Sequence, residues 1–174
     1  MTLDDLVKIG ELVSALVVLV SLIYVAVQLR SNNQIAQTSG HRDIIAQFND
    51  WYKEMEDPSL VKIIVRGARD FDELSFEDKL RFDTYIHRFM HMVEQSIYMG
   101  RDHYIPRGFY DAFIRGALAF TSYGAAKWWS QAQLTFSPDL TTIVETARQE
   151  TPDTPPIWEL FPTFIFAHKN EKSL

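Results

Sequence analysis

An uncharged apolar run near the N-terminus constrains this chain more than any other feature of its sequence. Leu12 to Leu29 is eighteen residues without a charged side chain, reading LVSALVVLVSLIYVAVQL. As an α-helix the run is about 27 Å long, close to the ~30 Å hydrocarbon thickness of a bilayer. Lys8 and Arg30 flank it and can extend to the two membrane interfaces. The sequence therefore predicts a transmembrane anchor helix within residues 1–30.

Two other interpretations of this run are weaker. A buried helix of a soluble protein carries its apolar side chains along one stripe, whereas this run is apolar almost all round. A cleaved signal peptide needs a basic N-terminal region and a small-residue cleavage site. Here Asp4 and Asp5 occupy the N-terminal region, and Ala26 is followed two residues later by the bulky Gln28. We therefore expect the segment to stay in the membrane as a permanent anchor.

The charges beside the span predict its orientation. Acidic and basic residues are mixed before it, whereas after it Arg30 and Arg42 precede the first acidic residue, Asp43. Basic residues close to a span favour the cytoplasmic side of the membrane. We therefore expect the C-terminal part of the chain to lie in the cytoplasm.

A weakly polar stripe follows one face of the predicted span. Its members occur at steps of three and four residues and lie within about 100° of one another around a helix: Glu11, Ser14, Val18, Ser21, Val25 and Gln28. Two interpretations remain open. The polar positions Glu11, Ser14, Ser21 and Gln28 form an oligomer or partner seam, because lipid offers them no hydrogen-bond partner and the last three repeat every seven residues, the period of left-handed helix packing. Alternatively, the serines bond back to their own helix and have no further role.

The rest of the chain predicts one small all-α domain of five or six short helices. Residues 31–43 form a polar juxtamembrane connector or a helix that leaves the bilayer, residues 44–150 the helical domain, and residues 151–174 a proline-rich and aromatic tail. No turn of the Asn-Gly type separates alternating segments, so strand signals are poor. The tail packs on the domain, lies on the bilayer interface or meets a partner.

Local signals place the expected helices. The apolar positions recur at spacings of three and four, and proline, glycine and serine mark the ends. The expected helices are Ile44 to just before Asp57-Pro58, Ser59 to Ala68, a helix capped by Ser75 that runs to Met99, one opened by Pro106, one from Gly124 to Leu134, and one capped by Ser137 that runs to Gln149.

Composition and motifs exclude several function classes. The 174-residue chain has a formal net charge of −6 and no cysteine. The lack of cysteine excludes a disulfide scaffold, a cysteine-ligated zinc site and a thiol nucleophile. The acidic balance argues against nucleic acid as a partner. Because no nucleophile elbow, phosphate loop or dinucleotide fingerprint is present either, we expect no cofactor and no enzymatic activity.

One constellation is able to carry chemistry. His87, His91, Glu94 and Tyr98 fall on one face of the helix predicted to begin at Ser75. Two imidazoles one turn apart, with a carboxylate three residues on, are able to ligate a divalent metal. His87, His91 and Glu94 are therefore the candidate metal ligands. The simpler interpretation is a half-buried polar face, with Glu94 and Tyr98 in it and Glu94 bonded to a tyrosine or histidine of a neighbouring helix.

Two further pairs of residues have ordinary structural interpretations. Asp111 and Arg115 are one helical turn apart and are expected to form a surface ion pair. Trp128 and Trp129 are expected to place one ring in the core and the other at the surface.

Several sequence motifs extend along most of the chain. Gly10 to Ala15 reads GELVSA, and Ser21 to Asn32 reads SLIYVAVQLRSN. Further motifs are Asp57 to Leu60 (DPSL), Gly67 to Ser75 (GARDFDELS), Met90 to Tyr98 around Glu94, and Trp128 to Pro138 (WWSQAQLTFSP). In these motifs the chain resembles a set of uncharacterised bacterial single-pass membrane proteins, over about residues 10 to 148. The resemblance implies a bacterial inner-membrane protein with a C-terminal helical domain, and it brings no activity.

The sequence therefore predicts a single-pass inner-membrane protein. Its expected partners are the lipid bilayer and either further copies of itself or a larger membrane complex, in which it is a non-catalytic scaffold or accessory subunit. A membrane-tethered metal- or ligand-binding enzyme or sensor that uses His87, His91 and Glu94 is the alternative. A small oligomeric channel is the second alternative.

Overall fold

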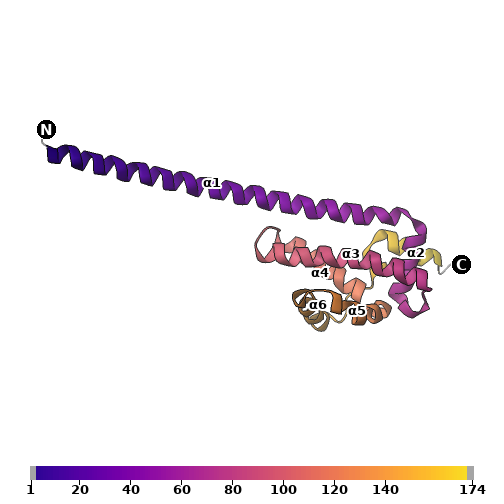
Figure 1. Cartoon of the computed structure of the whole chain (residues 1–174). Helices are drawn as coiled ribbons and strands as arrows, with labels where there is room; N and C mark the ends of the chain where they lie inside the picture. Colours follow the sequence, from indigo (N-terminus) through magenta and orange to yellow (C-terminus); the bar gives the residue numbers. More distant parts are fainter. Residues whose placement is uncertain (1–2, 172–174) are drawn as a thin grey trace. The chain divides into compact units, whose positions relative to one another are not determined.

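The chain is all-α, as its sequence predicts. The computed structural model describes residues 3–171, and these residues form α-helices and short 3-10 helices without a strand (Figure 1). The α-helices are α1 (Leu3–Lys53), α2 (Pro58–Arg69), α3 (Phe76–Arg101), α4 (Arg107–Thr121), α5 (Ala126–Ala132), α6 (Pro138–Glu150), α7 (Ile157–Leu160) and α8 (Pro162–Glu171). The 3-10 helices are Glu54–Glu56, Phe71–Glu73, Tyr123–Ala125 and Gln133–Thr135.

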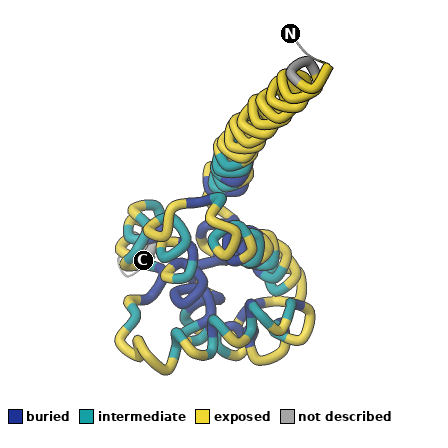
Figure 2. Tube along the Cα trace, turned by 90° about the vertical axis from the view of Figure 1, so that its left-hand side faces the viewer, coloured by how far each residue is buried: buried dark blue, intermediate teal, exposed yellow. Residues whose placement is uncertain are grey.

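The chain divides into two compact units between Ser39 and Gly40. The first unit is a single helix, the N-terminal part of α1. Every residue from Leu12 to Leu29 is exposed in it, so no face of the apolar run is covered by protein (Figure 2). This part of α1 is long and apolar enough to cross a membrane.

Residues 31–43 are helical, which is one of the two conformations expected for them. Helix α1 continues through them for 51 residues in all, so the helix expected to begin at Ile44 is also part of α1. The polar residues here are compatible with a helix, and the Thr38 hydroxyl donates to the Gln34 carbonyl oxygen at 2.9 Å. Gly40 alone does not end the helix. Its lack of a side chain admits Met99 instead, since a Cβ atom there would lie 2.6 Å from the Met99 methyl carbon.

Side-chain caps fix the starts of three helices of the second unit. Asp57 begins α2, Ser75 begins α3 and Ser137 begins α6. Each side-chain oxygen accepts a backbone N–H two or three residues later, at 2.9, 3.1 and 3.3 Å respectively. A proline follows directly in α2 and α6, where its fixed φ suits the first helical position. The predicted starts at Ser75 and Ser137 are therefore confirmed.

Trp51 lies at the centre of the aromatic core of the second unit. Trp51 is 1% exposed; its indole ring stacks on Tyr85 and packs at a tilt against Phe89, with ring centroids 4.5 and 4.8 Å away. Phe120 of α4 meets it edge-on at 5.9 Å. The indole N–H donates to the Tyr85 carbonyl oxygen at 3.0 Å. One side chain thus joins the last turns of α1 to α3 and α4.

The tail packs on the domain, which was one of its three predicted placements. Residues 151–156 form a non-helical connector, and the short helices α7 and α8 follow. Ile157 and Phe164 are 0% and 1% exposed within the same core as Trp51. The hydroxyl groups of Tyr52 and Thr163 lie 3.0 Å apart and bond the tail to α1.

Replacing Trp51 with alanine tests the role of this side chain. We expect Trp51→Ala to lower the free energy of unfolding of the domain by about 3–5 kcal/mol, because it removes a buried ring and leaves a cavity. Chemical denaturation of the full chain in detergent, followed by circular dichroism, measures the change. Leu134→Ala is the control, because Leu134 is 86% exposed and its loss is expected to change the free energy by less than about 0.5 kcal/mol. Equal changes in the free energy of unfolding for the two substitutions would contradict the central role given to Trp51 in the core.

Candidate functional site

The predicted polar face of α3 makes structural hydrogen bonds. Both ring nitrogens of His87 have partners, since Nδ1 lies 2.9 Å from Asp83 Oδ1 and Nε2 lies 2.8 Å from the Thr135 hydroxyl. The same Asp83 oxygen accepts the Trp128 indole N–H at 2.7 Å. His87 also stacks on Phe136 with ring centroids 4.7 Å apart. His87 therefore fixes the segment after α5 against α3.

Glu94 secures the start of α6. One oxygen of its carboxylate accepts the Ser137 backbone N–H at 2.9 Å, and the other lies 3.4 Å from His91 Nδ1. Partial burial raises the pKa of the Glu94 carboxyl, but the hydrogen bonds from Ser137 and His91 outweigh burial and hold that pKa below its ordinary value. Tyr98 is 43% exposed and lies beneath the guanidinium of Arg101 at 5.7 Å. Tyr98 thus belongs to the outer edge of this face.

This geometry does not support the metal alternative. A metal needs free nitrogen or oxygen donors that converge, whereas both nitrogens of His87 are already bonded within the protein. Among the side chains that the structure describes, no group of three or more imidazoles and carboxylates is arranged to hold an ion. The predicted half-buried polar face is closer to what is found. Glu94, however, bonds the Ser137 backbone amide at the start of α6 and His91 of its own helix, rather than a tyrosine or histidine of a neighbouring helix.

The polar stripe of α1 is partly satisfied within its own helix. The Ser21 hydroxyl donates to the Val17 carbonyl oxygen at 2.8 Å, and the Gln28 amide donates to the Tyr24 hydroxyl at 2.6 Å. Glu11 and Ser14 are exposed. Within the described residues the Ser14 hydroxyl has no partner. Ser21 therefore behaves as the simpler interpretation expects, whereas Ser14 is free to bond another helix.

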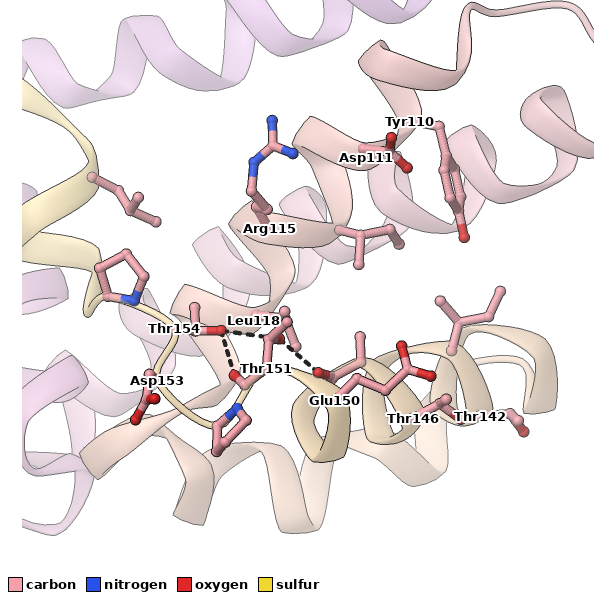
Figure 3. Close-up of a pocket in the computed structure, with 16 residues that line it drawn as sticks. Tyr110, Asp111, Arg115, Leu118, Thr142, Thr146, Glu150, Thr151, Asp153 and Thr154 are labelled. Carbon is pink, nitrogen blue, oxygen red and sulfur yellow. Dashed lines mark hydrogen bonds between the residues drawn. The ribbon is translucent and has the colours of Figure 1, made fainter.

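A cavity of the second unit lies between α4, α6 and the connector that follows α6. Its volume is about 810 Å³, within the range typical of small-molecule sites. Its floor is apolar and includes Ile114, Leu118 and Ile143. Figure 3 shows Arg115 on the α4 side and Glu150 on the opposite, α6 side.

The charged groups of this cavity are not paired with one another. Asp111 and Arg115 are one turn apart on α4, yet the ion pair expected between them is absent, so that prediction is wrong. Across the described residues the structure gives neither side chain an ion pair. Burial raises the pKa of the neighbouring Tyr110 hydroxyl, and the Asp111 charge adds to the increase. The cavity therefore presents a free guanidinium and free carboxylates above an apolar floor.

Sequence reasoning missed this cavity because its walls are distant along the chain. The only local signals were the one-turn spacing of Asp111 and Arg115 and the proline-rich segment after Glu150. The expectation for the tryptophan pair was also wrong, because Trp128 and Trp129 are both buried. The indole N–H of Trp128 donates to Asp83, and that of Trp129 donates to Glu145 at 2.6 Å, so a carboxylate at the domain edge allows each ring to be buried.

Comparisons with protein-family models, with curated proteins and with solved structures gave no match to this chain. The resemblance of its motifs to uncharacterised bacterial membrane proteins therefore stays a prediction. The function has to be argued from the residues themselves.

The Glu94 carboxylate provides a pH-dependent test of the α3 face. Because its pKa is lowered in the folded chain, its contribution to stability is present above the ordinary value of 4.5 and is lost as the pH falls through the folded-state pKa. We expect Glu94→Gln to reduce the free energy of unfolding by about 1–2 kcal/mol at pH 7 and by much less near pH 3. Denaturation of the full chain at both pH values measures this difference. The exposed Glu56→Gln serves as control, and an equal loss at both pH values would contradict the role given to the Glu94 charge.

Proposed function

We propose that this chain is a single-pass inner-membrane protein whose helical domain lies in the cytoplasm and acts as a non-catalytic scaffold or accessory subunit. The supporting observation is the exposure of the apolar run of α1 on every side. Leu16 and Val20, for example, are 61% and 59% exposed. Monomeric soluble proteins rarely expose apolar patches larger than a few hundred Å², because apolar contact with water is unfavourable. A bilayer removes this cost over the whole circumference of the helix.

The continuous helical geometry of α1 suits this environment. A spanning segment must satisfy all of its backbone N–H and C=O groups internally, since the hydrocarbon offers no partners. The helix has no proline or glycine between Leu12 and Leu29, so its hydrogen-bond ladder is uninterrupted there. The basic residues Arg30 and Arg42 support a cytoplasmic location for the domain.

The polar stripe supports assembly through this helix. Ser14 and Ser21 are small, which allows another helix to approach closely, and the Ser14 hydroxyl requires a partner that lipid cannot supply. The Gln28 amide oxygen is on the same face and accepts no hydrogen bond from the described residues. The seam therefore joins copies of the chain, or joins the chain to a larger membrane complex.

The topology is testable by cysteine labelling, because the chain contains no cysteine of its own. Leu3→Cys and Leu134→Cys place single thiols at positions that are 81% and 86% exposed. In intact cells with a permeabilised outer membrane, we expect a membrane-impermeant maleimide to label Leu3→Cys and to spare Leu134→Cys. Disruption of the inner membrane should expose both thiols to the maleimide. Labelling of Leu134→Cys from the outside would overturn the orientation, and release of the unmodified chain by alkaline carbonate would overturn the anchor.

The seam is testable by a matched pair of double variants. Ser14→Leu with Ser21→Leu adds bulk to the stripe, whereas Val20→Leu with Val27→Leu adds leucines at the same spacing, about 100–140° around the helix from the two serines. We expect the first variant to lose most of its association and the second to retain it, because close packing requires the small side chains. Native mass spectrometry of complexes extracted in mild detergent measures the mass. Unchanged masses for both variants would reject the seam.

A further inference from the structure

We propose that the cavity between α4 and α6 binds short apolar peptides of two or three residues with free termini. Four features of the cavity match four parts of such a ligand: its carboxylate, its ammonium group, its amide groups and its apolar side chains. The cavity belongs wholly to the helical domain, so the inference is independent of the membrane anchor.

Arg115 is the group that receives the peptide carboxylate. It is exposed on the α4 wall, and within the described residues it has no ion pair. Figure 3 shows its guanidinium at the α4 side of the cavity and directed away from Glu150, so this exposed side chain turns toward the cavity to meet the ligand. A guanidinium binds a carboxylate through two parallel hydrogen bonds, which makes it well suited to a ligand with a free C-terminus.

The opposite wall favours a positive charge. Glu150 is the last residue of α6, and Asp153 follows in the connector. The C-terminal end of a helix carries partial negative charge, which adds to the two carboxylates. Arg148, the basic residue of the last turn of α6, pairs with Glu145 at 3.1 Å. An ammonium group therefore finds its best position at this end of the cavity.

Hydroxyl groups along α6 match the amide groups of a peptide. Thr142 and Thr146 are one turn apart and both line the cavity. Thr142 and Thr146 are both exposed, unlike the buried Thr121, whose hydroxyl donates to the Ala117 carbonyl oxygen at 2.8 Å. The structure gives Thr142 and Thr146 no such bond in the described part of the chain, so both hydroxyls are available to a ligand.

The floor of the cavity accommodates apolar side chains. Ile114 and Leu118 from α4, Ile143 and Ala147 from α6, and Leu160 from α7 contribute to it. Placing leucine-sized groups there would remove apolar surface of both ligand and protein from water. The volume of about 810 Å³ is sufficient for two or three residues.

Binding of leucyl-leucine tests the proposal directly. Equilibrium dialysis of the radiolabelled dipeptide against the full chain in lipid nanodiscs at pH 7, with empty nanodiscs as background, is expected to show saturable binding to one site per chain. Three analogues each remove one feature: N-acetyl-leucyl-leucine removes the ammonium, leucyl-leucine amide removes the carboxylate, and glycyl-glycine removes the apolar side chains. We expect each analogue to bind about tenfold more weakly or worse.

Matched variants test which wall of the cavity binds each terminus of the peptide. Arg115→Gln is expected to abolish the preference for leucyl-leucine over its amide, and Glu150→Gln with Asp153→Asn is expected to abolish the preference over the N-acetyl analogue. Arg107→Gln removes the same charge from α4 outside the cavity and is expected to leave both preferences intact. All of these side chains are exposed, so folding is expected to be retained, and circular dichroism checks it. Absence of saturable binding, or equal binding of all four compounds to the unmodified chain, would overturn the proposal. Equal effects of Arg107→Gln and Arg115→Gln would overturn the assignment of the carboxylate.

Discussion

The contact of Trp51 with α3 and α4 is the interaction on which the helical domain depends. Its ring occupies the position where three helices meet, and its N–H, which would otherwise be unpaired in the core, donates to the Tyr85 carbonyl oxygen. Because α3 and α4 are aligned by this contact, the outer face of α4 is available to form a cavity with α6. The placement of the cavity walls thus depends on the packing of one buried indole.

Local chemistry explains why much of the fold was predictable. A serine or aspartate that caps a helix acts on amides two or three residues away, so Ser75 and Ser137 could be recognised without knowing the rest of the structure. The apolar run of α1 is similarly evident from neighbouring residues alone. The sequence left open whether residues 31–43 are helical, because their polar composition fits a connector as well as it fits the helix that is found.

Non-local partners explain the errors at the candidate sites. The partners of Glu94 and His87, Ser137 and Thr135, lie more than 40 residues away, so the metal interpretation competed with hydrogen bonds that no local pattern reveals. Both tryptophans are buried because Asp83 and Glu145 accept their indole protons. The cavity depends on three segments that only folding brings together. In each case the residue types were visible in the sequence, whereas their distances from one another were not.

The positions of the tryptophans have a practical consequence for work in lipid. All four lie between residues 51 and 158, and none lies in the N-terminal unit. Trp51, Trp128 and Trp129 are almost fully shielded from water. The tryptophan fluorescence of the native chain is therefore a spectroscopic reporter of the helical domain alone, usable in vesicles without any attached dye.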